Sequence, residues 1–364
     1  MRGPDAPRGR PRAAALAAAV AALAGALPVG PARAAPLCAS TNVTEAAVQA
    51  LRRDAARRGA PAPRAIAELH TEGSLPHQHA RDEALEARQD LPLMRELALL
   101  WHLRQDRPAL ARLAPLLDAW AAAYRPSFNP IDETGFDGLI DAYALAGANL
   151  PADTRARTAT LLRAWADGYL AQMQHPATPA QKTGANNWQS HRVKLATLAA
   201  AALGDDALFA QAREQFRLQV GRNLQPDGRS IDFDERDALH YVVYDLEPLA
   251  RAALAARLRG EDWLHLAGAN GATLAAGIDW LGPYARGERV HEEFRQTSVA
   301  FDRQRRDAGV AGFAGPWDPK GAAMLYGLAS RLDDRYRPLA LALGPPAPWL
   351  AACGAPPDPP GDPR

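Results

Sequence analysis

The feature that most constrains the fold is a series of helical apolar patterns that come in pairs with short turns between them. Apolar residues recur at intervals of three and four positions, as on one face of a helix, and Gly, Pro or Asp separates one pattern from the next. The paired segments are 91–103 with 109–124, 136–146 with 153–173, 185–203 with 206–218, 238–258 with 262–281 and 322–332 with 336–343, and one further helix is expected at 42–58. Alternating runs rich in Val, Ile and Thr are nearly absent, so we expect few strands.

Antiparallel helix pairs that repeat within one domain predict an all-α fold, an (α/α) toroid built of helix hairpins. A helical solenoid is the competing architecture, but the pairs show no fixed sequence period. No Ser/Gly-rich linker lies between Leu51 and Leu343. We therefore expect a single domain over residues 35–353, followed by a disordered tail rich in Pro, Gly and Asp at 354–364.

Residues 1–34 have the order of a secretory signal peptide. A basic start is followed by an alanine- and leucine-rich run at 13–27 and by Ala32-Arg33-Ala34, after which cleavage is expected. The basic residues are Arg2, Arg8, Arg10 and Arg12. A retained membrane anchor is the alternative, although the apolar run is short for a membrane span. We expect a periplasmic or secreted protein that has no membrane contact after cleavage.

The charge balance of the mature chain excludes non-specific binding of polyanions. Residues 1–34 contain five arginines and one aspartate, so their removal changes 42 basic against 41 acidic side chains into 37 against 40. No basic surface remains to bind nucleic acid. An anionic substrate would have to be bound by a local cluster of donors.

The only cysteines are Cys38 and Cys353, near the two ends of the mature chain. In an oxidising compartment they either form a disulfide or remain as two unpaired thiols, and the sequence does not decide between these states. Neither Cys/His nor Asp/Glu spacing indicates a metal site, so we expect no metal and no other cofactor.

Two polar clusters interrupt the apolar patterns between Lys182 and Leu249. The first is Asn-Asn-Trp-Gln-Ser-His-Arg at 186–192, and the second is Asp-Glu-Arg-Asp-Ala-Leu-His-Tyr at 234–241. On a helix, Asn187 and His191 lie four residues apart and share a face. A buried set of this kind without a role would leave donors and acceptors unsatisfied, so we interpret the two clusters together as a site. A structural hydrogen-bond network is the alternative for each residue alone.

A polar loop at 70–79 precedes the helix pairs and is a further candidate for binding. Loops held by a rigid scaffold often carry binding residues, and His70, Glu72 and Gln78 are the candidates here. Capping of a neighbouring helix is the structural alternative for this loop.

Several segments resemble the alginate lyases. The sequence Ala-Leu-His-Tyr at 238–241, followed by Leu-Glu-Pro-Leu at 246–249, resembles the helix that carries the catalytic tyrosine of these enzymes. Asn-Pro-Ile-Asp-Glu-Thr at 129–134, Leu-Ile-Asp-Ala-Tyr at 139–143 and the pair Asn186-Asn187 resemble the same superfamily. The resemblance covers roughly residues 70–332 and implies an (α/α)-toroid polysaccharide lyase that acts on a uronic-acid polymer.

One departure from the family pattern bears on the substrate. Alginate lyases of polysaccharide lyase family 5 carry Asn-Asn-His, whereas Trp188 follows the asparagine pair here and His191 lies one helical turn later. This pattern is more similar to polysaccharide lyase family 38, which implies activity on glucuronan or mannuronate-rich alginate. The preferred polymer stays open.

The steps of β-elimination at a 4-linked uronate suggest a role for each of the candidate catalytic residues. The C6 carboxylate must be neutralised, and amide and guanidinium donors such as Asn187 and Arg236, with Arg192 behind them, are suited to that. Tyr241 is our candidate for removing the C5 proton and for protonating the leaving O4, which lie on the same side in glucuronate and mannuronate. A phenol has an ordinary pKa of about 10, so Arg236 and His191 would have to favour its ionised form. We expect His191 to act as a second base or to hold the tyrosine and the carboxylate in place.

The remaining candidates are expected to bind substrate. His240 is expected to brace the site, while Trp188, with Trp101 and Trp280, can stack on sugar rings or pack in the core. The further substrate-binding candidates of the first cluster are Asn186, Gln189 and Arg192. An ordinary core tyrosine is the alternative for Tyr241. The alternative for Arg236 is a surface ion pair with Asp232, Asp234 or Glu235.

Two other functions are compatible with the same fold. A glycoside hydrolase needs two carboxylates that face each other across the scissile bond. The candidates are Glu72, Asp132, Glu133, Asp234 and Glu235. A non-catalytic periplasmic polysaccharide-binding protein would use the same residues without cleavage. In each case the expected partner is an anionic polysaccharide, bound by a monomeric chain.

Overall fold

The computed structural model describes residues 38, 43–59, 62–175 and 183–353, which all belong to one compact unit, residues 32–364. The described part of the chain contains helices and no strand; the two isolated bridges join Leu224 to Ser230 and Glu292 to Pro316. This confirms the all-α prediction. The predicted signal peptide and C-terminal tail lie outside the described residues.

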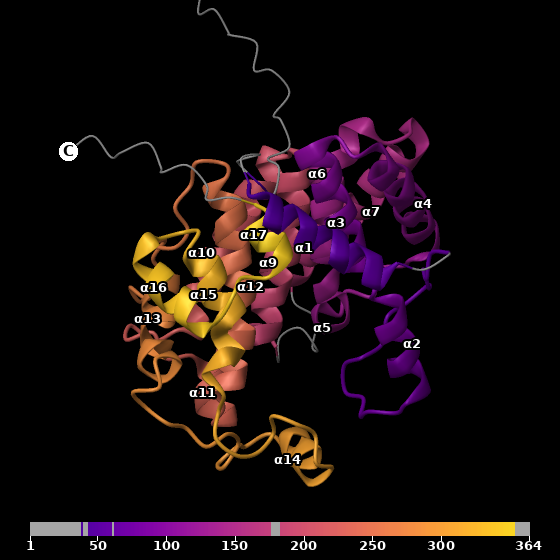
Figure 1. Cartoon of the computed structure of the whole chain (residues 1–364). Helices are drawn as coiled ribbons and strands as arrows, with labels where there is room; N and C mark the ends of the chain where they lie inside the picture. Colours follow the sequence, from indigo (N-terminus) through magenta and orange to yellow (C-terminus); the bar gives the residue numbers. More distant parts are fainter. Residues whose placement is uncertain (1–37, 39–42, 60–61, 176–182, 354–364) are drawn as a thin grey trace, which may run out of the picture. The chain divides into compact units, whose positions relative to one another are not determined.

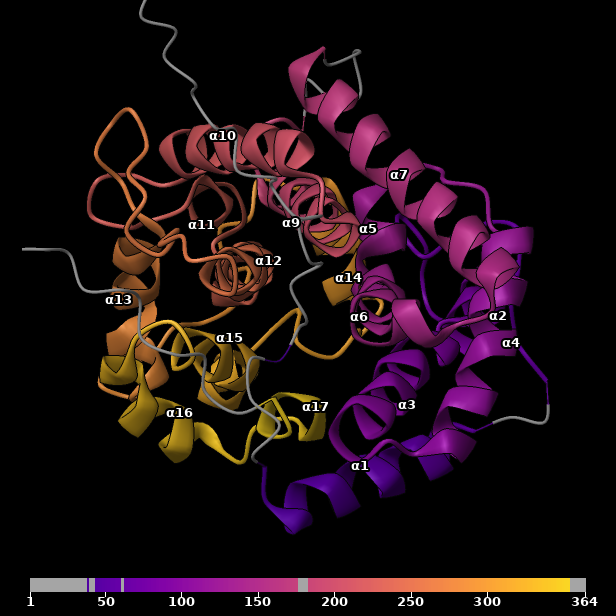
Figure 2. The same ribbon diagram turned by 90° about the horizontal axis from the view of Figure 1, so that it is seen from above.

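The helices of this unit form two concentric layers (Figure 1, Figure 2). Each inner helix packs against the next inner helix along the chain and against at least one outer helix. The inner helices are α3 (Asp90–Arg104), α6 (Asp137–Ala146), α9 (Asn187–Leu203), α12 (Leu239–Arg257) and α15 (Ala323–Ala329). The outer helices are α4 (Arg107–Ala123), α7 (Ala152–Gln174), α10 (Asp206–Asn223), α13 (Leu274–Ala285) and α16 (Arg337–Leu343). The predicted (α/α) toroid is therefore correct.

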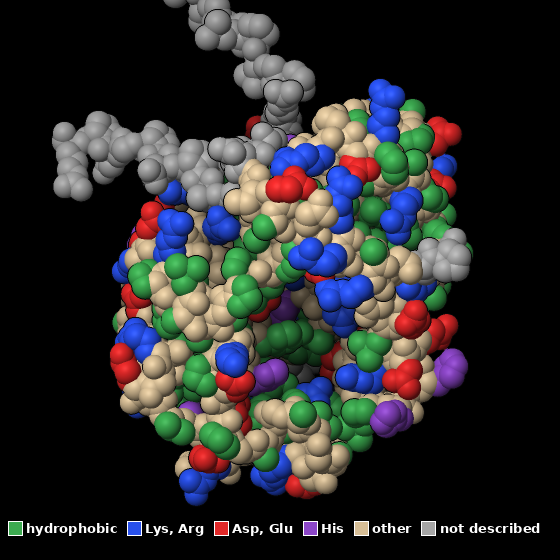
Figure 3. Space-filling view, viewed as in Figure 1, with side chains coloured by type: hydrophobic (Ala, Val, Ile, Leu, Met, Phe, Trp, Pro, Cys, Tyr) green, Lys and Arg blue, Asp and Glu red, His purple; other side chains and the backbone are tan. Residues whose placement is uncertain are grey.

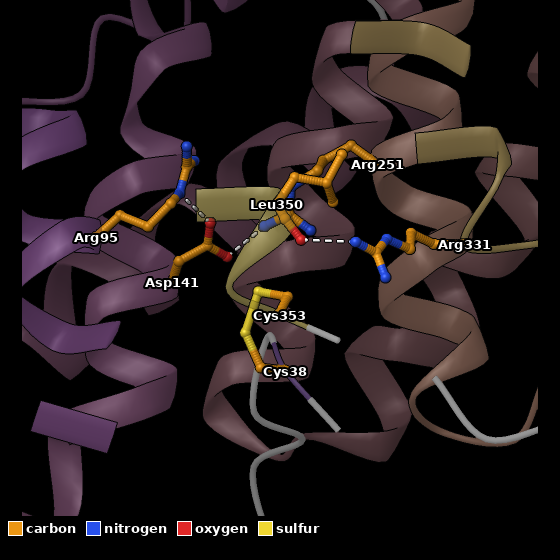
Figure 4. The surroundings of a disulfide bond; sticks show 7 residues. All are labelled: Cys38, Arg95, Asp141, Arg251, Arg331, Leu350 and Cys353. Carbon is orange, nitrogen blue, oxygen red and sulfur yellow. Dashed lines mark hydrogen bonds and ion pairs between the residues drawn. A yellow bond between two sulfur atoms is a disulfide. The ribbon is translucent and has the colours of Figure 1, made fainter. Parts of the chain in front are cut away.

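The ring is completed between α15 and α3 by the two ends of the domain. Helices α1 (Glu45–Arg58) and α17 (Pro348–Ala351) pack against each other and against α3. A disulfide joins Cys38 to Cys353 just beyond α17, which decides between the two states left open by the sequence. Figure 4 shows this bond beside Asp141, which bridges Arg95 and Arg251. The two ends of the domain are thus covalently tied where the ring closes.

Sequence chemistry explains where the inner and outer helices begin and end. Helix α9 is apolar or buried around nearly its whole circumference, as expected of a helix enclosed by neighbours, and its run of alanines at 199–202 allows close packing. It ends at Gly204, which has a φ of 66°. The next helix, α10, begins at once, because the Asp205 side chain accepts a hydrogen bond from the Leu208 N–H and caps it.

One predicted helix boundary is wrong, and one helix was not predicted. The helix expected at 262–281 begins only at Leu274, because Asp262 Oδ1 accepts from the Leu264 N–H in a local turn and Gly271 has a φ of 82°. Helix α14 (Ala300–Asp307) was not predicted, since its sequence is mostly charged and lacks an apolar period. The short helices α2 (His79–Ala87), α5 (Pro130–Glu133) and α11 (Ile231–Arg236) complete the site region.

None of the helices in the described residues is long and apolar enough to cross a bilayer.

Candidate active site

Tyr241 lines a cavity of about 190 Å³ between the start of α12 and the loops that follow α1 and α14. Figure 3 shows a hollow on one face of the molecule, with hydrophobic and histidine side chains inside it and basic side chains near its rim. The residues that line the Tyr241 cavity are Ser74, Leu75, Pro76, Arg81, Ile131, His240, Tyr241, Tyr244, Arg305, Val310 and Phe313. Segments far apart in sequence therefore meet around one phenol.

The joint between α11 and α12 places Tyr241 in this cavity. Asp237, between the two helices, has a φ of 51°, a left-handed conformation that Asp tolerates better than most residues. Its carbonyl accepts from the Phe294 N–H at 2.8 Å, and its Oδ2 accepts from the Gln296 N–H at 2.8 Å. The sharp turn makes Tyr241 part of the first turn of α12.

The first turn of α12 is capped by a residue from another segment. Ala238, at the N-cap position, has no side chain that can accept a hydrogen bond. Glu293 replaces it: its Oε1 accepts from the Leu239 N–H at 2.9 Å. Burial raises the pKa of Glu293 to about 7, although the backbone N–H groups act in the opposite direction.

Two guanidinium groups flank the phenol of Tyr241. Arg305 Nη1 donates to the Tyr241 hydroxyl at 2.9 Å, and the Arg236 guanidinium lies 3.8 Å from the centre of the Tyr241 ring. Burial raises the pKa of Tyr241, and the charges of Arg236 and Arg305 lower it. The phenol is 7% exposed, so these charges act on it with little screening by solvent.

Arg236 is held by an acid that the sequence did not suggest. Its Nη1 lies 2.6 and 2.8 Å from the two carboxylate oxygens of Asp302, and Asp302 is fully buried. The alternative considered for Arg236 was an ion pair with Asp232, Asp234 or Glu235; the acid that pairs with it here is instead Asp302 of α14. Arg305, also on α14, was missed; the basic sequence at 303–306 was its only signal, and it carries no periodicity that identifies a site.

His191 is fixed by a hydrogen bond with Thr134, which directly follows α5. It is 3% exposed, and its Nδ1 lies 2.7 Å from Thr134 Oγ1. The Lys194 ammonium, which can only donate, lies 2.7 Å from the same oxygen, so we assign the hydroxyl hydrogen of Thr134 to His191 Nδ1 and the ring proton to Nε2. Burial, and next Lys194, hold the pKa of His191 well below its usual value.

The other side of His191 faces α12. Pro248 has no N–H, so the carbonyl of Tyr244, four residues earlier, lacks its helical donor. This carbonyl raises the pKa of His191, and the ring of Tyr244 lies 4.4 Å from the imidazole. Tyr244 separates His191 from Tyr241, whose ring centre is 6.2 Å from that of Tyr244. This arrangement suits a neutral positioning histidine better than a second base.

Asn187 lies at the start of α9, where its polar groups are bound to Asp232. Its backbone N–H donates to Asp232 Oδ2 at 2.8 Å, its side-chain amide donates to Oδ1, and it is 1% exposed. Burial raises the pKa of Asp232 to about 6. Asn186 caps the helix by accepting from the Trp188 N–H at 3.2 Å. In this conformation the Asn187 amide holds α11 against α9.

Gln189 and Arg192 stabilise the segment before α9. Arg192 Nη1 donates to Gln189 Oε1 at 3.0 Å and to the Thr183 carbonyl at 3.1 Å. Trp188 is half-buried, with its ring centre 5.9 Å from the Arg192 guanidinium. Among the residues that line the Tyr241 cavity, none comes from the first polar cluster. The substrate contacts expected of this cluster stay predictions.

The loop at 70–79 does reach the cavity, but through other residues than those expected. Asp132 Oδ1 accepts from the N–H groups of Thr71 and Glu72, at 2.6 and 2.7 Å, which anchors the loop on α5. The side chains of His70, Glu72 and Gln78 are absent from the cavity lining, which this loop supplies through Ser74, Leu75 and Pro76. Small and apolar residues in a loop carry no sequence signal of binding.

The carboxylates considered for a hydrolase do not face each other in this cavity. Glu133 is fully buried and accepts from Tyr124 Oη at 2.8 Å and from Trp165 Nε1 at 3.1 Å. Asp132 is 2% exposed and anchors the loop, while Asp234 pairs with Arg229 at 3.3 Å. None of the five candidate acids is among the residues that line the Tyr241 cavity.

No group of three or more His, Cys, Asp or Glu within the described ranges is arranged to hold a metal ion.

Comparison with known proteins agrees with this geometry. The family described as "Alginate lyase" matches residues 42–291, more than half of the chain. The chain belongs to the alginate lyase family. It is therefore a polysaccharide lyase that acts on a uronate polymer. The more specific assignment to polysaccharide lyase family 38 is not part of this finding.

Several solved structures of alginate lyases have the same fold as this protein. An alginate lyase from Bacteroides ovatus matches with a TM-score of 0.59 and 16% identity, over 84% of this chain and 92% of that one. Alginate lyase A1-III from Sphingomonas species A1 matches with a TM-score of 0.56 and 17% identity, over 91% and 99%. A variant of A1-III in complex with a tetrasaccharide matches with a TM-score of 0.54 and 18% identity, over 93% and 100%. No curated protein sequence matches significantly.

Proposed function

We propose that this enzyme cleaves a 1,4-linked polymer of glucuronate, or mannuronate-rich alginate, by syn β-elimination with Tyr241 as both base and acid. The observation that carries the proposal is the position of the Tyr241 hydroxyl: it lines the cavity and accepts a hydrogen bond from Arg305 at 2.9 Å. In these two uronates the C5 proton and O4 lie on the same side of the ring. One phenol on that side can serve both proton transfers.

The two arginines beside Tyr241 support its role as a base. A phenolate must form before the C5 proton can be removed, and burial alone opposes that ionisation. Arg305 donates to the oxygen on which the charge develops, and Arg236 lies against the ring. Fixed cations in a cavity of low polarity stabilise such a charge more strongly than water-exposed ones.

Arginines of the cavity wall also supply donors for the substrate carboxylate. Arg81 lines the cavity, and its guanidinium group forms no hydrogen bond or ion pair with any residue that the structure describes. Its guanidinium can bind a carboxylate without breaking a contact already made, unlike Asn187 and Arg236. The A1-III variant, which is similar in fold, binds a tetrasaccharide. We infer that anionic sugar units bind here between Arg81 and Tyr241.

The proposal is tested by following the unsaturated product in the ultraviolet with polymannuronate, glucuronan and polyguluronate as separate substrates. We expect turnover on one or both of the first two, and a loss of at least about 100-fold in kcat for Tyr241→Phe, because removal of a general acid–base group costs that much or more. Tyr143→Phe, at a half-buried tyrosine of α6 outside the cavity, is the matched control and should retain full activity.

Two results would contradict the proposal. Turnover confined to polyguluronate requires groups on opposite faces of the sugar, which a single phenol does not provide. Absence of product on all three polymers, or full activity of Tyr241→Phe, would remove Tyr241 from the chemistry.

A further inference from the structure

A second cavity, of about 210 Å³, lies deeper inside the ring and meets the first at Tyr244. On α12, Tyr241, Tyr244, Glu247 and Arg251 lie three or four residues apart, so one face of this helix runs from the phenol into the interior. Helices α3 and α9 contribute Arg95 and Lys194. We call this space the interior cavity.

The fixed charges of the interior cavity sum to one positive charge before Glu247 is counted. Asp137 is paired with Arg95 at 2.6 Å and with Lys194 at 3.2 Å. Asp141 does not line the interior cavity itself, but it is paired with two residues that do, with Arg95 at 2.7 Å and also with Arg251. Three cations thus face two carboxylates.

Both guanidinium groups keep donors for a ligand. Only Nη2 of Arg251 donates to a described residue, and Nη1 of Arg95 donates to none. The two groups are held in place by Asp141 and by the ring of Trp349, at 4.6 Å from Arg95 and 5.4 Å from Arg251 (Figure 4 shows the two arginines on either side of Asp141). Fixed donors that face a cavity lower the ordering cost of binding an anion.

Glu247 is the unusual member of the lining. Its side chain faces the interior cavity, and its carboxyl group forms no hydrogen bond or ion pair with any described residue. A carboxylate in such a place is costly unless it gains a partner or a proton. Burial, opposed by Lys194, raises the pKa of Glu247 to about 7.

We propose that the interior cavity binds one uronate unit through Arg95 and Arg251, and that Glu247 takes up a proton from solvent when the uronate carboxylate enters. The choice of a uronate rests on the proposed function. With Glu247 protonated, the single positive charge matches the single negative charge of the ligand, and the carboxylic acid can donate to it. With Glu247 ionised, the lining is neutral and its carboxylate repels the ligand.

The other groups that face Glu247 keep their charge state through this change. From α9, His191 stays neutral, since its pKa is held well below the usual value, and Lys194 stays paired with Asp137. Asp137 stays ionised, because Lys194 and the arginines lower its pKa. Arg95 and Arg251 are charged, and α15 and α17 contribute the uncharged Met324, Leu328 and Trp349. Proton uptake on binding therefore reports on Glu247.

The test is calorimetric titration of the full chain with glucuronate and mannuronate monosaccharides at pH 6 and pH 8, with glucose as the neutral control. We expect affinity about tenfold weaker at pH 8, because the protonated fraction of a carboxyl with a pKa of about 7 falls by that factor. Binding at pH 8 should also take up close to one proton, seen as a dependence of the enthalpy on the ionisation enthalpy of the buffer. This second readout needs no variant.

Glu247→Gln, which keeps the size and removes the charge, should bind equally well at pH 6 and pH 8 and take up no proton. Glu288→Gln is the matched control, at an exposed glutamate paired with Arg286, and should behave as the wild type. The proposal is overturned if the monosaccharides do not bind, if wild-type binding takes up no proton, or if Glu247→Gln keeps the pH dependence. A monosaccharide has no bond to cleave, so these outcomes are independent of whether Tyr241 catalyses elimination.

Discussion

The Tyr241 phenol receives its electrostatic environment from residues that are distant in sequence. Arg305 lies 64 residues further along the chain, and the acid that orients Arg236, Asp302, is one helical turn before Arg305. Asp302 thus lies within reach of both cations, 2.6 Å from Arg236 and 3.9 Å from Arg305. Helix α14 is mostly charged and has no apolar stripe. It therefore contributes charged side chains to the site and does not pack into the apolar core.

Arg305→Gln should slow the enzyme and shift its pH dependence. The variant keeps a donor near the Tyr241 hydroxyl but removes the charge that lowers its pKa, so the rise of kcat/KM toward alkaline pH should move to higher pH. We expect kcat/KM at neutral pH to fall by roughly 10–100-fold, the usual loss when one charged group beside a reacting centre is removed. The measurement is a pH profile of the ultraviolet assay.

Arg306→Gln is the control for this variant, since Arg306 is on the same helix but is half-buried and pairs with Asp307. A profile of Arg305→Gln that overlays the wild type would show that Arg305 does not act on the phenol.

At the scale of elements, the start of α12 depends on a cap that comes from a distant segment of the same chain, the one before α14. Several helices of the toroid are capped by the side chain of their own N-cap residue, for example α4 by Asp106 and α10 by Asp205. Ala238 cannot do this, and Glu293 fulfils the function from 54 residues away. The segment at 291–298 is therefore tied to the tyrosine helix, through Glu293 and through the backbone of Asp237.

Glu293→Ala should destabilise the fold by about 1–3 kcal/mol, because it leaves buried N–H groups of α12 without an acceptor. The free energy of unfolding is measured by denaturant titration. Its neighbour Glu292 is exposed and makes no side-chain hydrogen bond or ion pair with the described residues, so Glu292→Ala should change stability little. Equal effects of the two substitutions would show that the cap contributes nothing.

At the scale of the whole molecule, the toroid encloses carboxyl groups in several places, and this makes its stability depend on pH. Burial raises the pKa of Glu96, Glu247 and Glu293 to about 7 each, well above that of a glutamate in the unfolded chain. They lie on α3, on α12 and before α14. Between pH 6.5 and pH 8 the folded chain therefore binds more protons than the unfolded chain.

The free energy of unfolding should accordingly fall as pH rises from 6.5 to 8, by roughly 2 kcal/mol for the three groups together. The sign follows from the raised folded-state pKa: the stabilisation is present at lower pH and is lost as pH rises through about 7. Denaturant titrations at the two pH values measure it, and Glu96→Gln should reduce the difference by about a third. Stability that is constant or rises over this range contradicts the prediction. His191, whose pKa burial holds well below its usual value, opposes the trend below about pH 7.5, where a histidine of the unfolded chain begins to take up a proton.

Much of the fold and part of the site could be predicted from the sequence of single segments. The apolar period of three and four residues located most of the inner and outer helices to within a few residues, because that period is a property of each segment alone. The segment 238–241 correctly marked the helix that places Tyr241 in the cavity. The helix expected at 262–281 begins only at Leu274, because Asp262 and Gly271 make local turns that compete with the apolar pattern.

Other features were decided only when distant segments came together. Arg305, Asp302 and Glu293 act on the start of α12 through contacts that span more than fifty residues, and no local pattern encodes such pairings. The same is true of Asn187. The sequence predicted that its donors bind the substrate, whereas in the folded chain they bind Asp232. A helix pattern depends on the energetics of neighbouring residues, so the sequence by itself determined the toroid. The environment of the phenol depends on which charges tertiary packing buries beside it, so only the tertiary structure decided the chemistry of the site.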